Sequence, residues 1–225
     1  MNLHNLLNIK LFNVLLVAVL LLGAAPVRAE GNGDEASARA GGELGEFDRI
    51  QVAGAYELHV QVGGKYAVNI SGSDRALGRL NVHVDDGTLV LDQNKEFADG
   101  FHLESLKATI TMPRLKGVEV KGFADVEIEG IDADTFDAEL GGAAAMELSG
   151  RCGALNARLS GIGELDAKAL RCKRVEVRVS GIGAASAYAS EVADVKSTGI
   201  GGIDIYGSPP IVNKDASPFS GVTIH

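Results

Sequence analysis

Apolar and polar residues alternate along much of the chain from residue 47 onward. Residues 56–62 and 65–70 each place an apolar side chain at every second position, and within residues 47–52 Ile50 and Val52 do the same. This period of two is typical of β-strands that bury one face and expose the other. Two further alternating runs, within residues 81–91, flank Asp86-Gly87, a pair that favours the turn of a tight β-hairpin. The pattern therefore predicts a strand-rich domain with a hairpin near its start.

A repeat of about twenty residues follows Pro113. Each copy has two short alternating runs that meet at a glycine, as in Val177-Arg-Val-Ser-Gly181-Ile-Gly. These corner glycines are 20, 19, 20 and 18 residues apart, and an earlier copy of the phrase opens the domain. The six corner glycines are Gly54, Gly122, Gly142, Gly161, Gly181 and Gly199.

A single repeat unit cannot bury its own apolar face, so neighbouring units must stack. An extended segment of this length, with corners, can close one coil and return to the same edge, where successive coils pair as parallel strands. Glycine at the corner permits a sharp bend and a close approach between coils. The sequence therefore predicts an all-β fold, a parallel β-helix (β-solenoid) of about 19–20 residues per coil. The N-terminal strands and hairpin would act as a cap.

The two cysteines lie at the same place in consecutive repeats. Cys152 is nine residues before Gly161, and Cys172 is nine residues before Gly181. Paired strands are about 4.8 Å apart, within the range of Cα separations that a disulfide tolerates. In an oxidising compartment we expect these two residues to form a disulfide, with two free buried thiols as the alternative.

The N-terminus has the features of a secretory leader. Residues 11–25 are almost entirely apolar, and Val27-Arg28-Ala29 then offers small residues at the positions that a signal peptidase reads. A membrane-spanning helix needs about 20 apolar residues, so cleavage is favoured over retention as an anchor. We predict a signal peptide at residues 1–29, a flexible linker at 30–45 and the β-helix domain at 46–225. The mature chain, without a membrane span, would be periplasmic, on the outer cell surface or secreted from a bacterium.

The charge balance limits the possible partners. Loss of the leader removes Lys10 and Arg28 and no acidic residue, which leaves 19 basic against 30 acidic residues and a net charge of −11. Phosphate binding needs clustered cations, so nucleic acid and anionic membrane surfaces are disfavoured.

One outward-facing column of the predicted stack is acidic. Its members stand five residues after a corner glycine, and they are Glu127, Glu147, Asp166 and Asp204. A hydrated acidic face explains them most simply; a Ca²⁺-binding strip is the alternative, although no local loop supplies the six or more oxygens that Ca²⁺ prefers. Two such acids could also flank a glycosidic bond, but the chain has no Trp on which a sugar could stack. The sequence therefore predicts no catalytic residue, no cofactor and no bound metal.

The Gly-Ile-Gly phrases, the opening Phe47 to Gly54-Ala and the closing Tyr206-Gly-Ser-Pro-Pro resemble the head GIN domain family. This family is also called "putative auto-transporter adhesin" and is a domain of unknown function. The resemblance covers about residues 47–225. It implies export, a β-helical fold and self-association, and it brings no catalytic residues with it.

Together these observations favour a non-catalytic, exported domain of the cell envelope that serves adhesion, assembly or ligand binding. Its partner would be a second copy of the chain, or an envelope polysaccharide or protein. The alternative is a polysaccharide-binding or carbohydrate-active β-helix protein.

Overall fold

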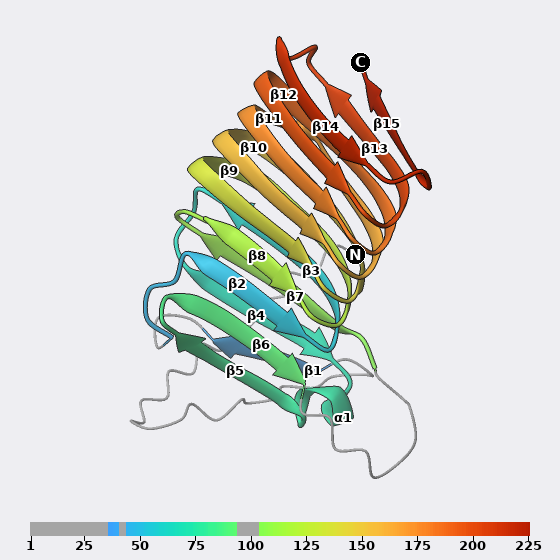
Figure 1. Ribbon diagram of the computed structural model, residues 1–225. Coiled ribbons are helices and arrows are strands. Elements are labelled where there is room, and N and C mark those ends of the chain that lie inside the picture. Colours follow the sequence, from blue (N-terminus) through green and yellow to red (C-terminus); the bar gives the residue numbers. More distant parts are fainter. Residues whose placement is uncertain (1–35, 41–43, 94–103) are drawn as a thin grey trace, which may run out of the picture.

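Stacked β-strands make up most of the chain in the computed structural model, which describes residues 36–40, 44–93 and 104–225 (Figure 1). The signal peptide predicted at residues 1–29 lies outside these ranges. The elements are β1 (Ala36–Ala40), β2 (Arg49–Ala53), β3 (Ala55–Val62), β4 (Ala67–Gly72), α1 (Asp74–Leu77), β5 (Leu80–Asp85), β6 (Thr88–Gln93), β7 (Leu106–Met112), β8 (Gly117–Val120), β9 (Phe123–Leu140), β10 (Ala143–Leu159), β11 (Ile162–Val179), β12 (Ile182–Ser197), β13 (Ile200–Tyr206), β14 (Ile211–Ala216) and β15 (Ser220–Ile224).

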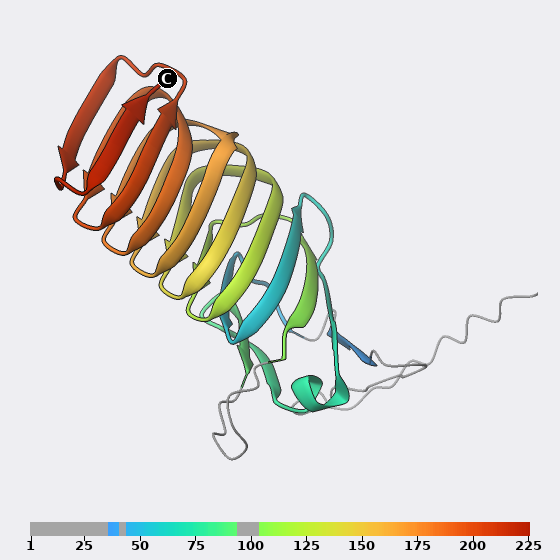
Figure 2. The same ribbon diagram turned by 90° about the vertical axis from the view of Figure 1, so that its right-hand side faces the viewer.

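Each of the long strands β9 to β12 bends and passes from one sheet to the other, so that one strand forms most of one coil (Figure 2). One sheet contains β1, β4, β7, β3, the first parts of β9 to β12, β13 and β15. The other contains β5, β6, β2, β8, the later parts of β9 to β12 and β14. We call their outer surfaces face A and face B respectively. The predicted parallel β-solenoid is confirmed.

The core lies between the two sheets and follows the predicted alternation. Val118, Leu140 and Val177 are at most 3% exposed, and the other long apolar residues at interior phases of the strands, such as Leu165 and Ile205, are buried too. Small residues occupy many of the remaining interior places, because the space between the sheets is thin: Ala138, Ala157, Ala167, Ala185 and Ala187 are all at most 1% exposed. The period of two along each strand therefore places the apolar residues in one continuous core.

The corner glycines form a column at one edge of the stack, where consecutive coils approach closely. A Cβ atom on Gly122, Gly142, Gly161, Gly181 or Gly199 would lie 1.8–2.0 Å from the carbonyl oxygen of the preceding corner glycine. No side chain fits there without moving the backbone. The glycines are needed mainly for this close approach, since none of these five has a positive φ angle.

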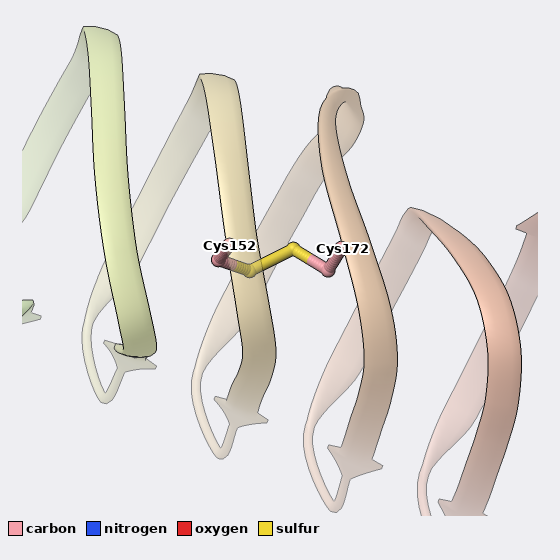
Figure 3. The surroundings of a disulfide bond; sticks show 2 residues. All are labelled: Cys152 and Cys172. Carbon is pink, nitrogen blue, oxygen red and sulfur yellow. A yellow bond between two sulfur atoms is a disulfide. The ribbon is translucent and has the colours of Figure 1, made fainter.

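The two cysteines lie opposite each other on β10 and β11 and form a disulfide (Figure 3). Their Cα atoms are 4.5 Å apart, the distance between neighbouring coils, and 20 residues separate them in the sequence. A cross-link that closes a loop of this length stabilises a folded chain by about 3 kcal/mol in the chain-entropy description. The bond therefore fastens two consecutive coils near the middle of the stack.

The order of the first coils in space differs from their order in the sequence. The coil of β2 and β3 lies between the coil of β6 and β7 and the coil of β8 and β9. Figure 1 shows β2 in blue between the green strands β6 and β8. The chain therefore returns below its own first coil through β4, α1 and the hairpin of β5 and β6. In this hairpin Asp86 and Gly87 both have positive φ angles, as the predicted tight turn requires.

Gln93 completes the corner beneath the first glycine. The Ala55 N–H donates to its side-chain oxygen at 2.8 Å, and its side-chain nitrogen donates to the Glu104 carbonyl at 3.1 Å. In later coils the matching N–H, as in Phe123, donates instead to the carbonyl of a corner glycine, here Gly54. The buried amide of Gln93, 4% exposed, thus supplies the acceptor that a corner-glycine carbonyl supplies in the later coils.

The linker predicted at residues 30–45 is wrong in one part. Residues 36–40 form β1, which pairs antiparallel with β4. Ala36, Ala38 and Ala40 alternate with Ser37 and Arg39, but alanine has a low β-propensity, so a strand was not expected here. It pairs because β4 presents an open edge, and backbone hydrogen bonds to such an edge need no particular side chains.

The last coil is formed by β14 and β15, whose outer edges pair with no strand among the described residues. Here the alternation breaks: Lys214 takes an interior phase, opposite Val195, and its ammonium group donates to the Val222 carbonyl at 3.1 Å. A charge over the end of the core discourages another strand from adding there. Within the described ranges, no helix is long and apolar enough to cross a membrane.

Candidate functional site

The acidic column lies on face A, with its members in register. Glu147 stands opposite Glu127 on one side and Asp166 on the other, so three carboxylates occupy three consecutive coils. Ser186 follows on the next coil, and Asp204 comes after it. The structure therefore brings the first three predicted acids together and separates the fourth from them by one coil.

Most of these carboxylates have a histidine or lysine neighbour. Glu127 contacts His59 Nδ1 at 2.9 Å, Asp166 contacts Lys168 Nζ at 2.8 Å, and Asp204 contacts His225 Nε2 at 2.9 Å. Glu147 has no ion pair or hydrogen-bonding side chain within the described part of the chain. Glu147 is thus a central, exposed negative charge with like charges on both sides.

His59 ends this column on the N-terminal side. Its Nε2 lies 2.8 Å from Glu57, and the hydrogen bond to this carboxylate raises the pKa of His59 above its ordinary value, with a smaller contribution from Glu127. The same hydrogen bond lowers the pKa of Glu57, which also contacts Lys107. The neighbours of His59 therefore favour its positively charged form.

The acidic column does not form a metal centre by itself. Over residues 44–93 and 104–225, no group of three or more His, Cys, Asp or Glu side chains converges as a metal ion would require. The carboxylates point outward from a flat sheet, whereas Ca²⁺ takes six to eight oxygens around it.

Face B carries a second column, which contains both signs of charge. Its members are in register on consecutive strands: Glu119, Glu139, Arg158, Arg178, Lys196 and Asp215. The cations have carboxylate neighbours, with Arg158 at 3.0 Å from Glu139 and Lys196 at 3.0 Å from Asp215. Arg178 pairs with Glu176 on its own strand. Three cations are therefore stacked between acidic ends.

A shallow groove of about 310 Å³ follows this column. The three stacked cations form one side of it. Its other side carries the hydroxyl groups of Ser160, Ser180 and Thr198, which stand next to the corner glycines. Such a groove can accept anionic or hydroxyl-rich groups from outside. The serine hydroxyls donate to backbone carbonyls of the preceding coil, so the serines act as parts of the corner.

A ridge of exposed apolar side chains runs along face A beside the corner glycines. Phe123, Ile162, Ile182 and Ile200 occupy this row and are 54–62% exposed. Beside it, a hollow of about 730 Å³ is lined mainly by alanine and glycine. Sequence reasoning missed both this ridge and the groove. The ridge could have been predicted, because its members directly follow corner glycines and have an outward phase in the alternation.

A family model described as "Putative auto-transporter adhesin, head GIN domain" matches residues 46–209. A putative adhesin from Bacteroides fragilis shares the fold, with a TM-score of 0.70 and 24% identity over 86% of this chain and 98% of its own. A putative lipid binding protein from Parabacteroides distasonis has a TM-score of 0.51 and 16% identity over 85% of this chain and 98% of its own. No curated protein matches the chain.

Proposed function

We propose, from the premise that this chain belongs to the head GIN domain family of "putative auto-transporter adhesins", that it is an exported, non-catalytic adhesion module of the bacterial cell envelope. The module would present faces A and B as fixed binding surfaces on a rigid stack. Its location would be the periplasm or the outer surface, reached through the leader predicted at residues 1–29.

One observation carries this proposal: the exposed side chains form straight columns in register on two flat faces. Their spacing equals the spacing of the coils, so a partner meets a regular array of charges, hydroxyls and apolar groups. The groove on face B, about 310 Å³, and the hollow on face A, about 730 Å³, are open and are lined by residues at equivalent positions of successive repeats. Such surfaces suit attachment over a large area, since specific interfaces bury at least about 1,200 Å² in total.

Polysaccharide binding is a second candidate, and the groove on face B favours it. Stacked cations next to a row of hydroxyl groups could hold the carboxylates and hydroxyls of an acidic sugar chain. Replacement of both Arg158 and Arg178 by glutamine should then abolish glycan binding. The same change at Arg114 and Arg174, which are exposed residues outside the groove lining, should leave it intact.

Binding of the mature chain to purified envelope material tests the adhesion proposal. We expect saturable binding to at least one envelope glycan or protein in a glycan array and a pull-down, with the same affinity in Ca²⁺ and in EDTA, because no described cluster is suited to a metal ion. Absence of binding to every fraction, or release of new sugar reducing ends during the incubation, would contradict the proposal.

A further inference from the structure

We infer that face A of one molecule docks on face B of a second copy, with the two stacks parallel and displaced by one coil. This inference rests on the proposed adhesive function, and it names a second copy of the chain as the partner of the two binding faces. It requires only the two charged columns and the purified chain, so it can fail or succeed independently of any envelope ligand.

The acids of face A and the cations of face B have the same spacing, because the same coils carry both. Glu147 and Arg158 belong to β10, and each coil adds one residue to each column. Neighbouring strands are about 4.8 Å apart, so both columns repeat at this distance. Two copies can therefore match many pairs at once if one offset brings opposite charges together.

A displacement by one coil gives this match. Glu127 of one copy then faces Arg158 of the other. Glu147 faces Arg178, and Asp166 faces Lys196. Each of these pairs joins a carboxylate on one coil to a cation on the next.

The ends of the columns fit the same displacement. His59, whose neighbours favour its charged form, faces Glu139. Ser186 faces Asp215 at the other end. The reversed orientation of the second stack, centred on the same three cations, places Asp204 against Glu119, two acids. Parallel stacks are therefore favoured by the charges.

The charges are available for a partner, and pairing relieves repulsion within each column. The side chains of Arg158, Arg178 and Lys196 are 49–54% exposed, and Glu127 is 49% exposed. Like charges on directly opposite positions of neighbouring strands are destabilising. A second copy would place an opposite charge over each of the three acids of face A and each of the three cations of face B. The ion pairs within one molecule are exposed and stabilise it little, so they can rearrange.

The contact area is sufficient for a specific but weak association. A face of six strands and about six residues in each strand measures about 29 by 20 Å, or roughly 600 Å². Two such faces bury about 1,200 Å² in total, at the lower end of specific interfaces. The contact is also heterologous, since face A meets face B, so each molecule keeps one free face and the association continues into a lateral array.

Charge reversal tests the inference. By sedimentation velocity on the mature chain, we expect concentration-dependent association at about 20 mM NaCl that is largely lost at about 500 mM NaCl. The single variants Glu147→Lys and Arg178→Glu should each reduce the association constant by about tenfold or more, because each sets like charges against each other at the centre of the contact. The double variant carries the swapped pair and should associate like the natural chain.

Matched controls separate this contact from a general effect of charge. Glu191→Lys and Arg114→Glu make the same changes of charge at exposed positions outside both columns and should associate normally. A chain that stays monomeric at low salt would overturn the inference, as would association that both single reversals leave unchanged or a double variant that does not recover. If only self-association fails while envelope binding persists, the adhesion proposal stands without this contact.

Discussion

Replacement of Gly161 by alanine is expected to prevent the domain from folding stably. The added Cβ would lie 1.8 Å from the carbonyl oxygen of Gly142, an atom that already accepts the Ile162 N–H at 2.9 Å. Because the obstacle is backbone, no rotation of a side chain can make room, and the two coils would have to separate. We expect a loss above about 4 kcal/mol in the free energy of unfolding, measured by chemical denaturation, or no soluble protein.

Gly202→Ala is the matched control for this variant. Gly202 lies in β13, and an added Cβ would meet no atom within 4 Å. Its backbone needs no positive φ, so alanine should change the free energy of unfolding by less than about 0.5 kcal/mol. Equal stability of the two variants would show that the corner glycines are not in close contact between coils.

Phe136→Ala should produce the second largest loss. Phe136 is a large, fully buried side chain at 0% exposure, on the part of β9 that lies opposite Leu155. Removal of its ring leaves a cavity in the core between the two sheets. The free energy of unfolding should fall by about 3–5 kcal/mol, measured by denaturation with urea.

The chain contains its own control for the loss of a phenylalanine. Phe123 begins the same strand but is 54% exposed on the ridge of face A. Phe123→Ala removes the same atoms without opening a cavity, so the loss of stability should stay below about 1 kcal/mol. Similar losses for both variants would mean that the burial assigned to β9 is wrong.

The regular part of the fold could be predicted because one local rule repeats. The spacing of the glycines and the apolar alternation determine which residues stack and which face the core, as Val177 and Leu165 illustrate. The position of the coil of β2 and β3 could not be predicted in this way. Its place depends on long-range pairing with β6 and β7. The apolar alternation within a strand does not indicate which distant strand it pairs with. The role of Gln93 could not be predicted for the same reason, because it depends on the neighbouring coil, whose Ala55 N–H donates to the Gln93 side chain.

The candidate surfaces were only partly predictable for a related reason. The sequence identified Glu127, Glu147 and Asp166 as one column, because all three are counted from their own corner glycine. The match between this column and the cations of face B depends on which coil carries which charge across two sheets. Counting residues from the corner glycines gives each column separately, whereas the structure shows how the columns of the two faces are aligned along the stack.

Both proposed binding surfaces require equal positions on consecutive coils to lie directly above each other. Disulfide trapping measures this most directly. Glu147 and Asp166 are in register on face A, whereas Glu164 lies two residues away from that register. Oxidation of the Glu147→Cys, Asp166→Cys variant should leave no free thiol, because its Cα atoms have the relation that the natural bond already shows. The Glu147→Cys, Glu164→Cys control should retain two thiols, and equal cross-linking of both variants, or of neither, would contradict the stacked register.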